Sequence, residues 1–121
     1  KIHTEYWELS EETANLINET KKQKGRVIAV GTTSVRVLEH ASQLSKGTEI
    51  QPGSGWADLF IFPGYYFKTV DGMITNFHLP RSTLLLLVSA FGTKDLIFKA
   101  YKEAILNRYS FYSFGDAMMI V

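Results

Sequence analysis

The chain has no cysteine among its 121 residues. This absence excludes disulfide bonds and thiolate metal ligands, so we expect no metal site of that kind, and it fits the reducing cytoplasm, where we expect the protein to reside. An excess of one charge is also missing, because basic and acidic residues nearly cancel to a formal net charge of +1. The near-neutral balance argues against a strongly basic, tail-like nucleic-acid binder, although it leaves room for a local basic face.

Long hydrophobic runs are missing as well. The longest ones, such as Leu84–Val88, are far shorter than the ~20 residues of a membrane-spanning helix, and neither a leader nor a repeat is visible, so we expect no membrane association. What the chain does have is 45% apolar and 13% aromatic residues, enough for one ordinary core. We therefore expect a single α/β domain over residues 1–121. Because it begins with Lys1 rather than Met, we also expect a fragment of a longer protein.

The first half of the chain predicts a helix, a strand and a second helix. Ser10 is placed to cap a helix that begins with acidic residues and ends with lysines before Gly25. The apolar run Arg26–Val30 predicts a strand buried on both faces. Thr32 or Thr33 is then expected to cap the next helix. This alternation favours the α/β class, with a mixed, partly parallel sheet flanked by helices.

The second half predicts shorter strands followed by two helices. Thr48–Gly55 reads as a surface loop, either a plain connector or a segment that orders over a ligand. Asp71–Gly72 is predicted as a two-residue hairpin turn. The expected elements are strands at 57–62, 66–70 and 73–77, helices at 82–91 and after the capping residue Thr93, and a last strand at 116–121. The last helix is expected to have one apolar stripe, formed by Ile97, Ala100, Tyr101, Ala104 and Ile105.

The first candidate site is the turn after the strand Arg26–Val30, where Gly31 is followed by Thr32, Thr33, Ser34 and Arg36. Free N–H groups at a helix start attract anions, the hydroxyls offer donors, and an arginine can pair with a carboxylate or phosphate. The lysine and spacing of a Walker loop are absent. Because any strand-to-helix turn favours Gly and Thr, an ordinary connection explains the same residues.

The second candidate lies where an apolar strand passes into an apolar helix. Asn76 and His78 alternate with apolar residues, so they share one face if the strand continues through them. A neutral His78 can exchange a proton near pH 7, and Asn76 can hold a base or a carboxyl group. Ser82 and Thr83 can cap the helix or bind an anion. A helix cap with a hydrogen-bonded core histidine is the structural alternative.

The third candidate is the aromatic tail around Phe114, whose rings can stack on bases or on a sulfonium cation, or simply fill the core. Asp116 follows it on an apolar strand, where a carboxylate needs a partner such as Arg36 or a ligand, unless it faces water. Near the start, His3 and Glu5 form a similar pair on one strand face. Metal ligation there lacks a third ligand.

Several short segments stand out when they are taken in order. They are His3–Tyr6, Val30–Arg36, Phe62–Tyr65, Ile74–Pro80, Ser82–Leu85, Ser89–Phe91 and Phe114–Met118. Together they resemble the C-terminal part of the S-adenosylmethionine:tRNA ribosyltransferase-isomerase family, and the resemblance covers essentially all 121 residues. One small departure is Arg81, where lysine is usual.

The resemblance implies a queuosine-pathway enzyme. Such an enzyme transfers the ribosyl part of S-adenosylmethionine, with isomerisation, to the aminomethyl group of a 7-deazaguanine in the tRNA anticodon loop. The product is epoxyqueuosine, and adenine and methionine are released. S-adenosylmethionine is then a substrate, and no resident cofactor is implied. The family's N-terminal portion, with its inserted β-rich domain, is absent here, so we expect a fragment of a larger two-domain enzyme that is inactive alone.

The implied chemistry gives each candidate residue a hypothetical role. His78 or Glu5 is the candidate base that removes a proton made acidic by the sulfonium. Gly31, Thr32, Thr33, Ser34 and Arg36, with Ser82, Thr83 and Asp116, are candidates for binding substrate, and Asn76 and Phe114 for binding adenine or the deazaguanine. Residues 31–36, Asn76, His78 and Asp116 are expected to line one shared cavity. A non-catalytic module that binds an anion, a nucleotide or RNA is the alternative function.

Overall fold

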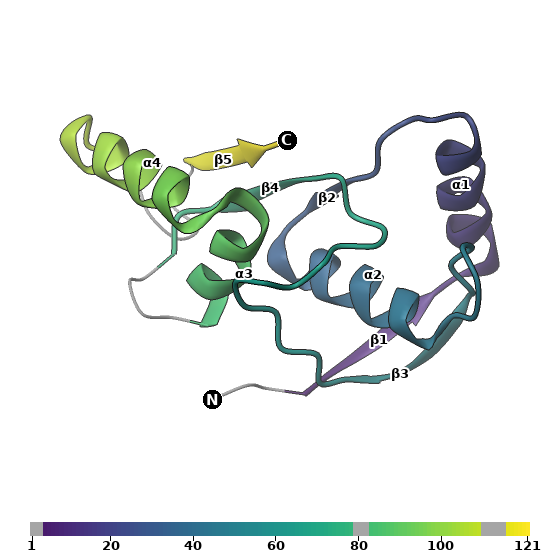
Figure 1. Ribbon diagram of the computed structural model, residues 1–121. Coiled ribbons are helices and arrows are strands. Elements are labelled where there is room, and N and C mark those ends of the chain that lie inside the picture. The colour runs from purple at the N-terminus through teal and green to yellow at the C-terminus, as the bar shows by residue number, and fades with distance from the viewer. Residues whose placement is uncertain (1–3, 79–82, 110–115) are drawn as a thin grey trace.

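The computed structural model describes residues 4–78, 83–109 and 116–121 and has an α/β architecture (Figure 1). Its elements, in chain order, are β1 (Glu5–Leu9), α1 (Glu11–Lys22), β2 (Ile28–Val30), α2 (Thr32–Leu44), β3 (Gly53–Ala57), β4 (Gly72–Asn76), α3 (Thr83–Gly92), α4 (Lys94–Leu106) and β5 (Ala117–Ile120). No helix in these ranges is long and apolar enough to cross a membrane.

The strands form two separate sheets. In the three-stranded sheet β4 lies in the middle, parallel to β2 and antiparallel to β5. In the two-stranded sheet β1 and β3 run antiparallel. Helix α2 contacts strands of both sheets and lies between them in Figure 1. The expectation of a mixed, partly parallel sheet flanked by helices is therefore confirmed.

Each sheet has its own apolar core. The larger core surrounds β4 and includes Met73, Val88 and Ile97, all at most 1% exposed. The smaller core lies beneath β1 and includes Trp7. Leu38 of α2 packs against both cores, so this helix joins the two halves of the fold.

Two of the predicted helix caps are confirmed and a third is wrong. The Ser10 hydroxyl accepts a hydrogen bond from the Thr13 amide at 3.1 Å, and the Thr93 hydroxyl accepts one from the Leu96 amide at 3.4 Å. Helix α2, in contrast, begins at Thr32, with Gly31 as its N-cap and no side-chain cap bond. Neither Thr32 nor Thr33 therefore caps this helix.

The predicted loop at 48–55 and the strand at 57–62 are shifted relative to the structure. Residues Gly53–Ala57 form β3, paired with β1, and no regular strand follows between 58 and 62. The ring of Trp7 lies 3.4 Å from the position that a Cβ on Gly53 would occupy. This distance is an ordinary van der Waals contact, so the glycines that suggested a loop lie in a strand beside this ring without being required there by crowding.

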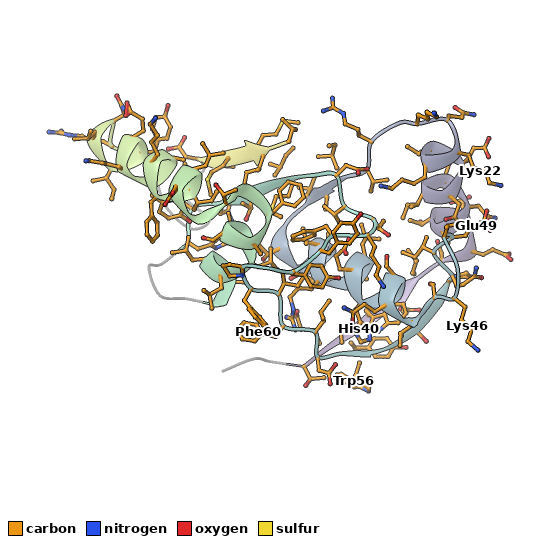
Figure 2. The ribbon with its side chains drawn as sticks, viewed as in Figure 1. Lys22, His40, Lys46, Glu49, Trp56 and Phe60 are labelled. Carbon is orange, nitrogen blue, oxygen red and sulfur yellow. The ribbon has the colours of Figure 1, made fainter. Side chains whose placement is uncertain are left out.

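The two-stranded sheet carries exposed aromatic rings on its outer side. Tyr6 and Trp56 are register partners, and their rings meet edge to face at 5.4 Å between centroids. Figure 2 shows Trp56 at the outer edge of the molecule. At the end of α1, Lys22 forms a surface ion pair with Glu49 at 3.3 Å, and both residues are labelled in the same figure.

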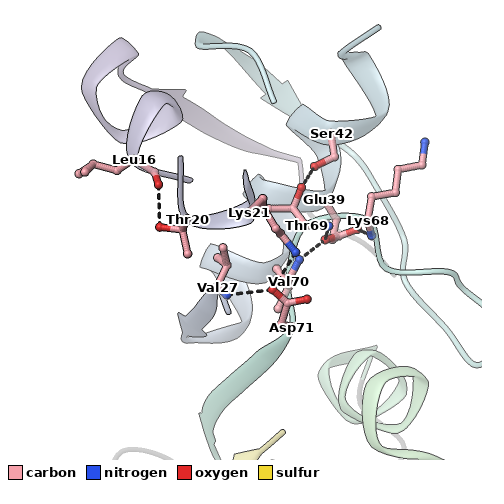
Figure 3. Close-up of polar contacts among 10 residues, drawn as sticks. All are labelled: Leu16, Thr20, Lys21, Val27, Glu39, Ser42, Lys68, Thr69, Val70 and Asp71. Atoms are coloured by element: carbon pink, nitrogen blue, oxygen red, sulfur yellow. Dashed lines mark hydrogen bonds and ion pairs between the residues drawn. The ribbon is translucent and has the colours of Figure 1, made fainter. Parts of the chain in front are cut away.

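The predicted strand at 66–70 is wrong because a buried carboxylate binds its amides. Glu39 of α2 is 0% exposed and accepts hydrogen bonds from the amides of Lys68, Thr69 and Val70 at 2.8–2.9 Å (Figure 3). It also accepts one from the Tyr65 hydroxyl at 2.9 Å. Burial and the nearby Glu39 charge raise the pKa of Tyr65. Because these amides donate to the carboxylate, they cannot also donate to the backbone of a neighbouring strand.

The predicted hairpin at Asp71–Gly72 is also wrong. The Asp71 carboxylate accepts hydrogen bonds from the Val27 amide at 2.9 Å and from the Lys21 ammonium at 2.7 Å (Figure 3). Gly72 then pairs with Ile28 in the parallel ladder. A Cβ on Gly72 would lie 2.7 Å from Ile28 Cδ1 and 3.0 Å from the Ile120 carbonyl oxygen. This glycine therefore serves close packing of three strands rather than a turn.

Two burial expectations differ in detail from the structure. Of β2, only Ala29 is buried, and Val30 is 68% exposed, so the strand is not covered on both faces. On α4 the expected apolar stripe is confirmed at Ile97, Tyr101 and Ala104, whereas Ile105 at its end is 65% exposed.

Candidate functional site

A pocket of about 300 Å³ opens at the carboxyl ends of β2 and β4. Its volume falls at the lower end of the range of small-ligand sites. Residues from both strand ends, the start of α2 and the first residue of β5 surround it. They are Val30, Gly31, Thr32, Thr33, Ile74, Thr75, Asn76, His78 and Ala117.

The strand register explains why residues so far apart in sequence meet here. Val30 pairs with Ile74 in the parallel ladder, so both strands end at the same edge of the sheet. The Gly31 amide extends the ladder by donating to the Ile74 carbonyl at 2.8 Å. Antiparallel β5 begins at the same edge, where Ala117 pairs with Asn76. Open α/β sheets place their ligand sites at such carboxyl edges.

Gly31 forms the turn from β2 into the pocket-lining start of α2. Its φ of 96° lies in a region that residues with a side chain rarely adopt, while no atom lies within 4 Å of the position that a Cβ would occupy. Backbone conformation, and not crowding, therefore requires glycine. Thr32 and Thr33 begin the 13-residue helix α2 beside it. Their free amides and hydroxyls offer donors to a polar or anionic group.

His78 is held at two points. Its imidazole Nε2 lies 2.7 Å from the Thr75 hydroxyl oxygen, and its backbone amide donates to the Tyr101 hydroxyl at 2.6 Å. Burial lowers the pKa of His78, so the ring is neutral near pH 7. Burial raises the pKa of Tyr101, against the opposing effect of the hydrogen bond from the His78 amide. The pocket thus contains a neutral imidazole of fixed orientation.

Asn76 and His78 reach the pocket by different routes. β4 ends at Asn76, which is exposed, while the next residue, Phe77, is 3% exposed and packs edge to face on Tyr101. His78 lies beyond the strand and returns to it through the hydroxyl of Thr75. Both residues line the pocket as predicted, although a continuous strand face is not the reason.

Glu5 and Arg36 form a second polar cluster. The Arg36 guanidinium binds the Glu5 carboxylate at 2.6 Å and donates to the Leu59 carbonyl at 3.2 Å, which ties α2 to β1 and to the segment after β3. Neither residue lines the pocket, and neither do Ser34 and Asp116. The expectation that residues 31–36, Asn76, His78 and Asp116 line one cavity is therefore only partly met, because Ser34, Arg36 and Asp116 lie outside the pocket lining.

The remaining candidates lie where the structure gives no side-chain description. His3, Ser82 and Phe114 fall outside the described residues, and of Thr83 only its place at the start of α3 is given. Within the described ranges no three His, Asp or Glu side chains are grouped so that they could hold a metal ion.

Sequence reasoning missed the two residues that hold His78. Thr75 and Tyr101 looked like a strand residue and a core residue, and their polar atoms gave no signal until the fold brought them to the histidine. A second pocket of about 280 Å³ was missed as well. It lies between the end of α2 and the segment held by Glu39, and its lining includes Ser42, Thr69 and Lys68.

Comparison with known proteins places this geometry in context. A family model described as a queuosine biosynthesis protein matches residues 1–120. The S-adenosylmethionine:tRNA ribosyltransferase-isomerase of Natranaerobius thermophilus is 60% identical over 120 residues, which are 99% of this chain and 34% of that protein. The protein of the same name from Caldanaerobacter subterraneus subsp. tengcongensis is 58% identical over 121 residues, 100% of this chain and 35% of its own length.

A solved structure agrees with the sequence matches. The crystal structure of S-adenosylmethionine tRNA ribosyltransferase from Thermotoga maritima has a TM-score of 0.86 to this fold at 47% sequence identity, and the match covers 96% of this chain and 40% of that chain. The chain thus spans about a third of the length of the curated relatives it matches. The resemblance predicted from the ordered segments is confirmed.

Proposed function

The chain belongs to the queuosine biosynthesis protein family, and from this membership we propose that it forms the C-terminal part of an S-adenosylmethionine:tRNA ribosyltransferase-isomerase. In the proposed reaction the ribosyl part of S-adenosylmethionine is isomerised and joined to a 7-aminomethyl-7-deazaguanine in the anticodon loop of tRNA. Epoxyqueuosine forms in the tRNA, and adenine and methionine leave. We place this activity in the cytoplasm, with S-adenosylmethionine as a substrate.

The observation that carries the proposal is the pocket at the carboxyl edge of β2 and β4. It joins a helix start rich in donors, at Gly31, Thr32 and Thr33, to an amide and a neutral imidazole, at Asn76 and His78. The reaction has to bind a polar sulfonium substrate, move a proton and release a purine. The pocket offers a group suited to each of these tasks.

We assign the pocket residues as follows. The start of α2, at Gly31, Thr32 and Thr33, binds the polar hydroxyl or carboxylate groups of the substrate. The carboxamide of Asn76 recognises the adenine edge, because an amide can both donate to and accept from that edge. His78 is the residue of the pocket that handles a proton.

The other candidates remain predictions for the complete enzyme. Glu5 is the alternative proton-handling group, held by Arg36 outside the pocket. The remaining substrate-binding candidates are Ser34, Arg36, Ser82, Thr83, Phe114 and Asp116.

A direct assay tests the proposal in the full-length protein. The protein is incubated with S-adenosylmethionine and with tRNA that carries the aminomethyl deazaguanine, and free adenine and the mass of the modified nucleoside are measured. We expect one adenine released for each ribosyl group gained by the tRNA. Binding of S-adenosylmethionine without adenine release would instead identify a non-catalytic module, and tRNA binding that is indifferent to S-adenosylmethionine would identify an RNA scaffold.

A further inference from the structure

The imidazole of His78 has two nitrogens in different surroundings. Nε2 faces the Thr75 hydroxyl at 2.7 Å. Nδ1 has no hydrogen-bond partner among residues 4–78, 83–109 and 116–121. In a neutral imidazole one nitrogen carries the proton and donates, while the other accepts. Which nitrogen carries it decides what His78 can do for a substrate in the pocket.

The burial of Thr75 decides between the two tautomers. The residue is 4% exposed, and in the described part of the chain its hydroxyl has only His78 Nε2 as a partner. If Nε2 carried the proton and donated it to the hydroxyl oxygen, the hydroxyl hydrogen would have no acceptor among the described residues. If the hydroxyl donates to an unprotonated Nε2, both groups are satisfied. An unsatisfied buried donor costs about 1–3 kcal/mol, which is about a 5- to 150-fold preference.

We propose that Thr75 is a positioning residue that holds His78 in the Nδ1–H tautomer, so that His78 donates a hydrogen bond from Nδ1 to a substrate in the pocket. The hydrogen bond from the His78 amide to the Tyr101 hydroxyl at 2.6 Å fixes the backbone from which the ring extends. The tautomer itself is a property of the resting protein. Its use in turnover rests on the proposed function.

This tautomer gives His78 a specific task. A ring that carries its proton on Nδ1 and accepts at Nε2 from Thr75 has no free lone pair for taking a proton from the substrate. It is suited to donate to an electron-rich atom, and in the proposed reaction the departing adenine has such atoms in its ring nitrogens. Proton removal then falls to another group, for which Glu5 is the candidate on this chain.

The test is NMR of the full-length protein labelled with ¹⁵N in its histidine rings. Long-range correlations between carbon-bound protons and ring nitrogens distinguish a protonated nitrogen from an unprotonated one, and His78→Gln identifies the signals. At pH 7.5 we expect protonated Nδ1 and unprotonated Nε2 in at least about fivefold excess. A resting ring with its proton on Nε2 would overturn the proposal.

Two variants separate the hydroxyl from the shape of Thr75. Thr75→Ser keeps the hydroxyl and is expected to keep the Nδ1–H form. Thr75→Val keeps the shape and suits a strand, but it removes the donor, so the excess of the Nδ1–H form is expected to fall severalfold. An unchanged tautomer in Thr75→Val would show that another group sets it and would contradict the role of Thr75.

The adenine-release assay keeps this inference distinct from the proposed function. If the wild-type ring is in the Nδ1–H form and adenine is not released, the proposed function fails while the positioning role of Thr75 stands. If adenine is released by a protein whose ring is in the Nε2–H form, the function stands and this inference fails. We expect turnover to fall in Thr75→Val and to recover in Thr75→Ser.

Discussion

The polar groups at the two ends of β4 differ in whether their hydrogen bonds are already used within the fold. Before its first residue, Glu39 and Asp71 each bind backbone amides, and Glu39 is fully buried. After its last residue, Asn76 is exposed and His78 keeps one ring nitrogen without a partner among the described residues. We call the end at Glu39 and Asp71 the closed end, because its polar groups use their hydrogen bonds within the fold. We call the end at Asn76 and His78 the open end, because its polar groups can still bind a ligand.

The comparison shows that a polar residue is best judged by whether its hydrogen bonds are already used. Glu39 has the chemistry of a catalytic carboxylate, but its two oxygens accept four hydrogen bonds within the fold. Such a group stabilises the native segment 65–70. Groups at the open end contribute less to folding and remain available for binding.

The largest effect is expected at the closed end. Glu39→Ala removes the acceptor of three amides and the Tyr65 hydroxyl in a buried place, so the free energy of unfolding of the full-length protein should fall by about 3–5 kcal/mol. Denaturant unfolding measures it. Glu103→Ala, at an exposed position of α4, is the matched control and should change it by less than about 0.5 kcal/mol. Equal losses of unfolding free energy in Glu39→Ala and Glu103→Ala would contradict the structural role of Glu39.

If Glu39→Ala does not fold, Tyr65→Phe provides the milder measurement. It removes one of the four hydrogen bonds to Glu39 and keeps the ring, so a loss of about 1 kcal/mol is expected.

At the open end the larger effect should be on turnover. His78→Asn in the full-length protein should slow adenine release by about 10²–10⁴-fold, because a positioned proton-donating group is lost. The free energy of unfolding should change far less than in Glu39→Ala. Glu103→Ala, at an exposed position of α4 outside the pocket lining, is the control and should retain its rate. Near-normal turnover of His78→Asn would remove His78 from the chemistry.

A moderate effect on stability is expected at the turn into the pocket. Gly31→Ala forces a residue with a Cβ to a φ of 96° and should lower the free energy of unfolding by about 1–3 kcal/mol. Because the space that a Cβ would enter is open, the loss should come from backbone strain alone, so larger side chains at this position should cost little more than alanine. A steep dependence on side-chain size, measured by denaturant unfolding of Gly31→Ala and Gly31→Leu, would indicate crowding instead.

The smallest effect concerns pH. Burial lowers the pKa of His78 in the folded protein, so below about pH 6.5 the unfolded state binds a proton that the folded state does not. The free energy of unfolding should therefore fall between pH 7 and pH 5.5, by less than about 1 kcal/mol because the ring is only half-buried. His78→Gln should lack this part of the loss. If the free energy of unfolding depended on pH identically in the wild-type protein and in His78→Gln, the lowered pKa of His78 would be contradicted.

The sequence predicted those elements that depend on residues close to one another in the chain. Ser10 and Thr93 cap their helices through the amide three residues later, and the apolar spacing of α4 gave its buried face. The prediction of a strand at 66–70 failed because its aromatic and β-branched residues are typical of a strand, but its amides bind Glu39, about 30 residues earlier. No pattern around Glu39 indicates a buried carboxylate, since its partners are brought to it only by the fold.

The candidate site shows the same difference between what neighbouring residues determine and what only the fold determines. Gly31, Thr32, Thr33, Asn76 and His78 were predictable, because strand ends of a parallel pair meet at one edge. Arg36 was expected beside them from its place in the sequence, but the next turn of the helix directs it to Glu5 and Leu59.

The most direct test of the account is a crystal structure of the full-length protein with S-adenosylmethionine bound. We predict the ligand at the open end of β4, with its adenine near Asn76, His78 Nδ1 within hydrogen-bond distance of it, and its polar groups at the start of α2. A ligand in the pocket beside Ser42 and Thr69 at the closed end, with the edge at Gly31 and His78 unused, would contradict it.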